Sequence, residues 1–487
     1  MTLLVTATQR TILFLIADTG AGHRSAANAI TNAIRLISQK EQEEWQAGQS
    51  TAQADVDQFQ QQVGDATLVQ FPPPTYRIET VDVFEEYSRF PLREAVKLYG
   101  PTIRYNPKLF GEVFHRSNRE GTVLTANTLA RPLIHNGLLR LITSTQPDVI
   151  VSIHPLFNHP TIKVLRELRL HIPFLTVVTD LVSIHYSWYA PGADAYIVPT
   201  EQARQLYLER GLNPKKVHML GMPIDPKFTR TTETKKDLQQ RFGLKPGVPV
   251  VLLVGGGDGA GGLQTAVRAI SQAHLPVQLL VVTGRNKRLY AHLQRIRAQL
   301  HVPAKIFGFV QNMPELMHAS DVIITKAGPG TICEALACKL PIILSGYVPG
   351  QEEGNVEFVV NNHVGTLAQS PIELVDTLRR LLKPGSRELR QQQDNAKRLS
   401  KPFASFDIAE CILDFLPPRN QPSTWQSVQW QRQHLTMSGR LRSAIRIRRF
   451  RRRLPRPLLN IPLMSRLSHL GIRGLSNRGT ASKDQDR

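Results

Sequence analysis

The chain has 487 residues, of which 41% are hydrophobic and 20% charged, a composition typical of a globular protein long enough for two or three domains. Its apolar runs are far shorter than the roughly 20 residues that cross a bilayer, and its first fifteen residues lack the pattern of a secretory signal. Three cysteines are too few and too scattered for a disulfide framework or a zinc site, and they fit a reducing, cytoplasmic setting.

The formal net charge of +21 is concentrated near the C-terminal end of the chain. No acidic residue occurs between Phe415 and Lys483, whereas 15 Lys and Arg residues lie from Arg419 to Lys483. A block this basic is attracted to anionic surfaces, either lipid head groups or nucleic acid. We favour a basic amphipathic segment at a membrane surface; RNA binding and a solvated, disordered tail are the alternatives.

The first predicted element is a buried strand over residues 11–16, followed by the turn A-D-T-G-A-G-H-R-S and an amphipathic helix. The turn is similar to a dinucleotide-binding loop, but Ser25 replaces the third glycine of G-x-G-x-x-G. His23 lies where the strand gives way to the helix, at the edge of an α/β sheet where ligands bind. A helix N-terminus disfavours the protonated imidazole, so His23 is a candidate general base; a capping or packing histidine is the alternative.

The next segments differ in composition from the first strand and helix. Residues 39–62 carry nine glutamines and predict a solvated insertion or an extension of the helix. A strand is predicted over 76–84, with Asp82 near its end. Residues 84–142 combine aromatic and basic residues with prolines, a pattern typical of short amphipathic helices in a membrane interface. A helical subdomain packed on the sheet explains the same pattern.

Three further strands are predicted over residues 148–153, 174–179 and 195–198. The first ends at His154 and the second at Asp180, with His185 in the loop that follows. Strands that alternate with helices predict a parallel, doubly wound sheet whose strand ends share one edge. The sequence G-M-P-I-D-P at residues 221–226 has the composition of a domain junction.

A second series of strands begins after this junction. An apolar strand over 248–254 leads into a glycine-rich loop at 255–262, whose backbone can approach a ligand closely and which does not match a nucleotide-hydrolase loop. Strands over 279–282 and 304–307 follow, and the last predicted helix spans 405–416.

Residues 308–365 carry the most informative pattern. An apolar run leads into Gly328-Pro329-Gly330-Thr331, a helix-like segment follows, and a second apolar run ends in the loop Q-E-E-G-N at 351–355. Such a turn presents free backbone N–H groups and the positive end of a helix dipole, which suits a phosphate. Glu334, one turn further along, is placed to accept hydrogen bonds from ribose hydroxyls. An ordinary βαβ unit with a glycine turn is the alternative interpretation.

Four motifs occur in the right order for a known family: ADTGAGHRSAANAI, VTDLVSIHYSWY, GGGDGAGGL and GFVQNMPELMHASDVIITKAGPGTICEALACKLPIILSGYVPGQEEGN. With them, residues 11–413 resemble glycosyltransferase family 28, which includes monogalactosyldiacylglycerol synthases, processive diacylglycerol glucosyltransferases and, more distantly, the lipid II-forming N-acetylglucosaminyltransferase. The resemblance implies an α/β GT-B fold with two Rossmann-like domains facing across a cleft, inverting chemistry, a UDP-sugar donor and no required metal or other cofactor. Ala21 departs from many relatives, which have glycine there, and the glutamine-rich segment and arginine-rich tail lie outside the shared pattern.

The resemblance also implies a role for each matching residue. The acceptor side of the cleft would hold the general base, His23, with its neighbours Gly22, Asp180 (also a catalytic candidate) and His185. The donor side would be formed by Gly256, Gly257, Gly328, Gly330 and Thr331 at the diphosphate, Glu334 at the ribose, Phe309 and Val310 at the uracil, and Gln351, Glu352 and Asn355 at the sugar.

From these patterns we expect a UDP-sugar-dependent hexosyltransferase that moves galactose, glucose or N-acetylglucosamine to a diacylglycerol-type lipid. The expected domains are 1–225 for the acceptor, with a membrane-facing helical segment, 226–400 for the UDP-sugar, a helix at 401–418 and a basic tail at 419–487. We expect the protein to be peripheral on the inner, cytoplasmic face of the cell membrane, with the basic tail and the aromatic segment on an anionic surface and no specific nucleic acid partner. A UDP-sugar 2-epimerase and a non-catalytic basic membrane- or RNA-binding protein on the same scaffold are the alternatives.

Overall fold

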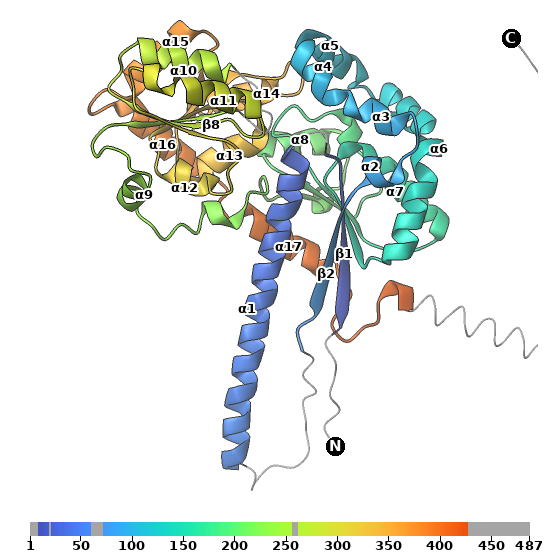
Figure 1. The fold of residues 1–487 in the computed structure, drawn as a ribbon. Coiled ribbons are helices and arrows are strands. Elements are labelled where there is room, and N and C mark those ends of the chain that lie inside the picture. Colours follow the sequence, from blue (N-terminus) through green and yellow to red (C-terminus); the bar gives the residue numbers. More distant parts are fainter. Residues whose placement is uncertain (1–7, 19–20, 60–71, 256–261, 427–487) are drawn as a thin grey trace, which may run out of the picture. The chain divides into compact units, whose positions relative to one another are not determined.

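The computed structural model describes residues 8–18, 21–59, 72–255 and 262–426. Within them, two six-stranded parallel sheets lie one after the other in the chain, each with helices on both faces (Figure 1). The strands of the first sheet are β1 (Gln9–Ile16), β2 (Thr75–Asp82), β3 (Val149–Ser152), β4 (Phe174–Val177), β5 (Ala195–Val198) and β6 (Val217–Met219). Those of the second are β7 (Val250–Val254), β8 (Gln278–Val282), β9 (Ala304–Phe307), β10 (Val322–Lys326), β11 (Ile342–Gly346) and β12 (Gly365–Leu367).

The helices alternate with these strands. In the first half they are α1 (Ala21–Phe59), α2 (Val83–Tyr87), α3 (Leu92–Lys97), α4 (Tyr99–Tyr105), α5 (Pro107–Ser117), α6 (Glu120–Thr145), α7 (Asn158–Leu168) and α8 (Glu201–Glu209). In the second half they are α9 (Lys235–Arg241), α10 (Leu263–Gln272), α11 (Lys287–Ile296), α12 (Met313–His318), α13 (Pro329–Ala337), α14 (Glu353–Asn361), α15 (Pro371–Leu381), α16 (Arg387–Leu399) and α17 (Ala404–Asp414). Short 3-10 turns include η1 (Pro155–Phe157), η2 (Tyr186–Trp188) and η4 (Pro226–Phe228).

The order of the strands fixes where each sheet can bind a ligand. The first sheet has the order β2-β1-β3-β4-β5-β6 and the second β12-β11-β10-β7-β8-β9. The strand order therefore reverses between β1 and β3 in the first sheet and between β7 and β10 in the second. Ligands of open α/β sheets bind at the carboxyl ends of the strands beside such a reversal.

Burial on both faces explains why the strands are continuous apolar runs. In β1, Leu13 and Leu15 belong to the core beneath α6 and α7, whereas Ile12, Phe14 and Ile16 pack with α1. Parallel strands covered on both sides are apolar at nearly every position, unlike the alternating strands of half-exposed sheets. The predicted strands are confirmed for this reason, while β6 and β12, each of three residues, were not predicted.

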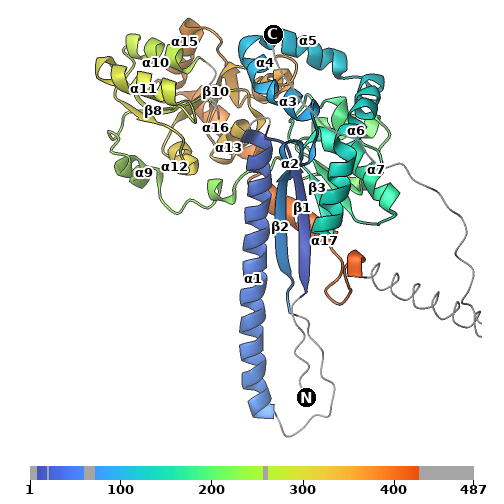
Figure 2. The same ribbon diagram turned by 45° about the vertical axis from the view of Figure 1, so that its right-hand side comes forward.

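Several predicted boundaries differ from the structure by one or two residues; the strand predicted over 174–179, for example, ends at Val177. The strand predicted over 76–84 ends at Asp82, because the Asp82 carboxylate caps α2 by accepting a hydrogen bond of 3.0 Å from the Glu85 N–H. The glutamine-rich segment continues α1 as far as Phe59, so the helix extension was the correct alternative up to that residue. Figures 1 and 2 show the C-terminal part of α1 extending beyond β1 and β2.

The chain returns to the first sheet after it completes the second. Ile408, Ala409 and Ile412 of α17 are fully buried in the same core as α1. The Arg10 guanidinium then donates hydrogen bonds to the carbonyls of Pro418 (2.7 Å) and Gln421 (2.6 Å). The predicted tail, 419–487, therefore begins with residues that pack on the first half up to Gln426; the rest of it, including the arginine-rich block, lies outside the described residues.

We expect Ile412→Ala to destabilise the protein by about 2–5 kcal/mol, because it removes buried apolar atoms between α17 and the first sheet and leaves a cavity. Denaturant unfolding followed by circular dichroism would measure the change. Ile372→Ala, at a position 75% exposed, is the matched control and should change stability little. Equal effects of the two substitutions would contradict the docking of α17 on this sheet.

Candidate active site

Two histidines meet where the strand order of the first sheet reverses. His23 lies in the first turn of α1 and His154 is the second residue after β3, with 4.8 Å between their ring centroids. Burial lowers the pKa of His23 to about 4, although a hydrogen bond with the backbone of Ala17 and the charge of Asp18 oppose this shift. Burial and the neighbouring His23 also lower the pKa of His154. Both imidazoles are therefore neutral at neutral pH, the form in which a histidine accepts a proton.

The Nδ1 atom of His23 is buried and has no hydrogen-bond partner among the described residues. His154 Nδ1, in contrast, accepts a bond of 3.3 Å from the Leu156 N–H, and its ring lies 4.9 Å from that of Phe157. Most buried polar atoms in proteins are paired. The unpaired nitrogen of His23 lies at the edge of the sheet where a ligand is expected.

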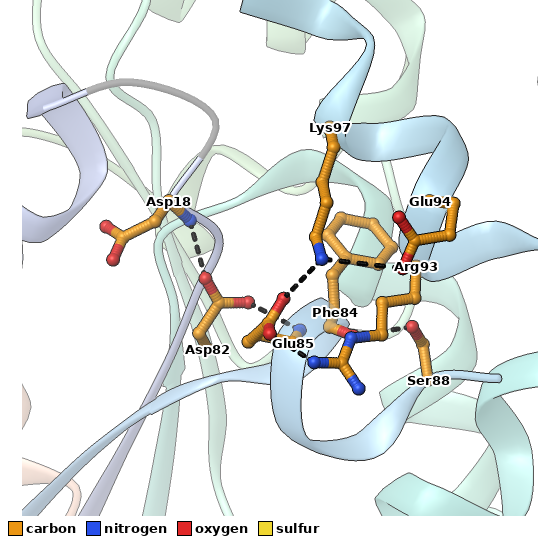
Figure 3. Close-up of polar contacts among 8 residues, drawn as sticks. All are labelled: Asp18, Asp82, Phe84, Glu85, Ser88, Arg93, Glu94 and Lys97. Carbon is orange, nitrogen blue, oxygen red and sulfur yellow. Dashed lines mark hydrogen bonds and ion pairs between the residues drawn. The ribbon is translucent and has the colours of Figure 1, made fainter. Parts of the chain in front are cut away.

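A network of acidic residues ties the His23 turn to the helices that follow β2 (Figure 3). The Asp18 N–H donates to Asp82 (2.8 Å), and the Asp18 carboxylate accepts bonds of 2.8 and 2.9 Å from the Arg24 Nε. Glu85 of α2 in turn forms ion pairs with Arg93 and Lys97, both of α3. Asp82 therefore links Asp18, at the end of the segment after β1, to the start of α2.

Asp180, which follows β4, contacts both halves of the chain. Its carboxylate accepts a hydrogen bond of 2.6 Å from the Trp188 indole and is hydrogen-bonded to the side chain of Gln351, in the loop after β11. Burial, with a smaller contribution from the charge of Glu352, raises the pKa of Asp180 to about 6, although these two hydrogen bonds oppose the shift. The residue predicted on the acceptor side thus touches a residue predicted to contact the sugar.

The loop at residues 347–353 and the start of α14 fit against the first half through glycines. Gly354 donates its N–H to Ser183 Oγ (3.0 Å), and a Cβ atom at Gly354 would lie 2.5 Å from that oxygen. A Cβ at Gly350 would approach Phe114 of α5 to 3.0 Å, and one at Gly111 would approach the Cβ of Pro349 to 2.8 Å. These distances leave little room for a side chain at the three glycines, so the two surfaces fit closely against each other.

His185 lies beside this contact rather than in the open. Its Nε2 is 3.1 Å from Ser117 Oγ, and its ring centroid is 4.9 Å from that of Phe114. Burial and the charge of Arg210 lower the pKa of His185 to about 4. In this structure His185 fixes α5 to the loop after β4, and its predicted contact with the acceptor stays a prediction.

The second cluster lies where the strand order of the other sheet reverses, after β10. Gly328 is the N-cap of α13, with no side chain capping the helix, and Pro329, Gly330 and Thr331 form its first turn. The leading N–H groups of a helix have no partner within the helix, so this end can bind an anion. Gly256 and Gly257, predicted to face the same diphosphate, lie outside the described residues.

The side chains of Glu352 and Asn355 surround this turn. Glu352 is 5% exposed; one of its oxygens accepts from Lys326 Nζ (2.6 Å) and the other from the Val348 N–H (2.9 Å). Asn355 donates to the Ala327 carbonyl (2.9 Å), and its buried Oδ1 has no partner among the described residues. Lys326 was not predicted as a site residue, although a lone cation at the end of an apolar strand was a usable signal.

Glu334 lies in α13, beyond the glycine turn. Burial raises the pKa of Glu334 to about 7, and the neighbouring Asp225 carboxylate adds to the shift. Asp225 itself accepts a hydrogen bond from Asn32 of α1 (3.1 Å). A carboxyl group of this pKa changes its charge near neutral pH, so hydroxyl donors from a ligand would favour the ionised form.

Of the two residues predicted to border the uracil, one is exposed to solvent. Phe309 is 63% exposed, and the Arg285 guanidinium lies 5.6 Å from its ring centroid. Val310 packs at the margin of the core next to it. Gly22, predicted on the acceptor side, is exposed at the start of α1, with open space where a Cβ would be.

Comparison with known proteins gives the same family for both halves. The family model described as monogalactosyldiacylglycerol (MGDG) synthase matches residues 58–224. The family model of the glycosyltransferase family 28 C-terminal domain matches residues 250–408. A probable monogalactosyldiacylglycerol synthase 2 of Oryza sativa subsp. japonica is 35% identical over 431 residues, 86% of this chain and 83% of the relative. Monogalactosyldiacylglycerol synthase 3 of Arabidopsis thaliana is 33% identical over 416 residues, 83% of this chain and 81% of the relative.

Solved structures share the fold at low sequence identity. MurG of Acinetobacter baumannii matches with a TM-score of 0.50 and 13% identity, over 83% of this chain and 99% of that one. The UDP-GlcNAc 2-epimerase of Neisseria meningitidis matches with a TM-score of 0.50 and 14% identity, over 84% of this chain and all (100%) of that one. The two parallel sheets and these neighbours confirm the predicted GT-B fold.

We expect Gly354→Ala to weaken the contact with the first half, because its methyl group would lie 2.5 Å from Ser183 Oγ and 2.9 Å from Val182 Cβ. Overpacking of this kind costs about 1–3 kcal/mol and should lower the melting temperature. Adding Ser183→Gly should restore part of the loss. Gly121→Ala, in α6 with no atom within 4 Å of the new methyl group, is the control and should not lower the melting temperature; a similar drop in both variants would contradict the close fit.

Proposed function

This chain belongs to the monogalactosyldiacylglycerol synthase family, and from that membership we propose that it transfers a hexose from a UDP-sugar to a diacylglycerol-type lipid, with inversion at the anomeric carbon. The observation that carries the proposal is the 35% identity to a relative of that name over 86% of the chain. The neutral His23 at one strand reversal and the uncapped α13 at the other support it.

On the donor side, we assign the diphosphate to the first turn of α13. Its free N–H groups stabilise negative charge, and this charge grows on the diphosphate as the bond to the sugar breaks. Glu334 is assigned to the ribose hydroxyls, and Phe309 with Val310 to the uracil. Gln351 and Glu352 are assigned to the sugar hydroxyls.

On the acceptor side, His23 is the proposed base. The acceptor oxygen attacks the anomeric carbon and loses its proton to the imidazole, while the electron pair of the breaking bond leaves on the β-phosphate oxygen of UDP. Burial holds His23 neutral before the reaction, and the nearby Asp18 carboxylate favours the imidazolium that forms. The proposal needs no metal ion or cofactor, so activity should persist in a chelator.

The surface of the helices after β2 favours an acceptor that lies in a membrane. Exposed apolar side chains recur on these helices and the turns between them: Phe90, Leu98, Leu109, Val113, Leu124 and Leu129. In α5, Gly111 packs against Pro349 while Leu109 and Val113 are exposed, so the helix has one buried and one open side. Such a helix, with basic neighbours, can lie in the membrane interface. No helix in the described part of the chain is long and apolar enough to span a bilayer.

We propose galactose as the sugar, since the names of the relatives specify it, and the inner, cytoplasmic membrane face as the location. The test incubates the full chain with UDP-galactose, UDP-glucose or UDP-N-acetylglucosamine and with liposomes of diacylglycerol and anionic lipid. A β-linked galactolipid supports the proposal. Another glycolipid would correct the sugar, an epimerised nucleotide would favour the 2-epimerase, and binding to liposomes without any product would favour the non-catalytic alternative.

We expect His23→Ala to lower turnover by about 10²–10⁴-fold, because a positioned base contributes that much, while UDP still binds. Steady-state kinetics on liposomes and titration calorimetry with UDP would measure the two effects. His301→Ala, at an exposed position of the other half, is the matched control. If His23→Ala turned over near the wild-type rate, His23 would not be the general base.

We expect the Michaelis constant for the UDP-sugar to fall as the pH rises through about 7, because Glu334 loses its proton there and the carboxylate accepts the ribose hydroxyls better than the acid does. Glu334→Gln should raise the constant and remove this pH dependence. The difference between wild-type and variant profiles from pH 6 to 8 measures the contribution of Glu334. Parallel profiles would show that Glu334 does not contact the donor.

A further inference from the structure

Lys326 places a cation beside the glycine turn that precedes α13. It is the last residue of β10, and the pairing of β10 with β11 shifts in register between Thr325 and Lys326. A Cβ atom at Gly328 would lie 3.9 Å from Lys326 Nζ. The ammonium group therefore lies next to the helix N-cap and not out along the surface.

Glu352 accepts only one of the three N–H donors of the Lys326 ammonium group. Nζ donates to Glu352 Oε1 at 2.6 Å, and this is the only bond that Nζ makes to residues described in the structure. A lysine ammonium has three N–H donors, so two remain. The Lys326 side chain is 34% exposed, whereas that of Glu352 is 6% exposed, so the free donors are on the open side of the pair.

Glu352 holds the ammonium group in this position. Its second oxygen accepts the Val348 N–H at 2.9 Å, which fixes the carboxylate to its own loop. An ion pair with one member buried and hydrogen-bonded is well ordered, unlike an exposed pair between two long side chains. Lys326 therefore connects the turn before α13 to the loop that carries Gln351 and Glu352.

We propose that Lys326 is a catalytic residue of the donor site, whose free N–H donors bind the diphosphate while Glu352 holds the ammonium in place. This inference rests on the proposed function. When the bond between the anomeric carbon and the β-phosphate oxygen breaks, its electron pair stays on that oxygen. A helix N-terminus supplies only about half a unit of positive charge, so the free N–H donors of Lys326, whose charge is shared with Glu352, add to the stabilisation of the leaving UDP.

The test distinguishes binding of the diphosphate from binding of the uracil and ribose. Titration calorimetry compares UDP with uridine on the full chain. Lys326→Gln should lower the affinity for UDP by about 10- to 100-fold, as expected for the loss of hydrogen bonds to a charged group, and leave that for uridine unchanged. Equal losses for both ligands, or no loss for UDP, would overturn the proposal. Lys383→Gln, an exposed lysine of the same half, is the matched control and should bind both ligands as the wild type does.

Two further variants separate charge from packing. Lys326→Arg keeps the charge and should bind UDP more tightly than Lys326→Gln; the reverse order would contradict a role for the charge. Lys326→Gln leaves Glu352 without its cation, so Lys326→Gln with Glu352→Gln should recover thermal stability but not UDP affinity. Recovery of both would mean that Lys326 serves only to neutralise Glu352. A wild-type chain that fails to bind UDP would instead refute the proposed function itself.

Discussion

The arrangement of the site depends on one close contact, between the segment at residues 347–354 and the first half of the chain. At Gly111 and Gly354 a Cβ atom would lie less than 3.0 Å from an atom of the other half, and at Gly350 it would lie 3.0 Å from Phe114. The contact brings Gln351 to Asp180 and the Gly354 N–H to Ser183 Oγ. The residues assigned to the sugar are thus positioned by the half that is assigned to the acceptor.

Desolvation dominates the electrostatics of both clusters. It keeps His23 neutral, raises the pKa of Asp180 to about 6 and raises that of Glu334 to about 7. All three groups follow or lie close to strand ends at the edges where ligands of such sheets bind. Strongly shifted pKa values in groups at such edges are common at functional sites.

The sequence predicted the parts of the fold that depend on local pattern. Strands covered on both faces were found because they are continuous apolar runs, and Gly328-Pro329-Gly330-Thr331 was found because glycine and proline mark a helix start. The end of β2 was missed because it depends on the capping of α2 by Asp82, and β6 and β12 because three residues carry too short a pattern.

The missed features of the site depend on contacts between distant residues. Lys326 pairs with Glu352, 26 residues away, and Asp180 is hydrogen-bonded to Gln351 across the two halves. Burial raises the pKa of Glu334, and Asp225, which belongs to the junction between the sheets, adds a smaller contribution. Neither spacing nor periodicity encodes such pairs, so His185 and Asp180 were assigned to the acceptor without the partners that the structure gives them.

The glycine contact also bears on how such enzymes diverge and can be recombined. A chimera joined at the junction near residue 225 would combine one acceptor half with the sugar-contacting loop of another protein. Because Gly354 leaves no space for a methyl group against Ser183, that loop would have to match Val182, Ser183 and α5 of its new partner. Under the proposed assignments, sugar preference and lipid preference are coupled through this contact, and a change in one surface calls for a compensating change in the other.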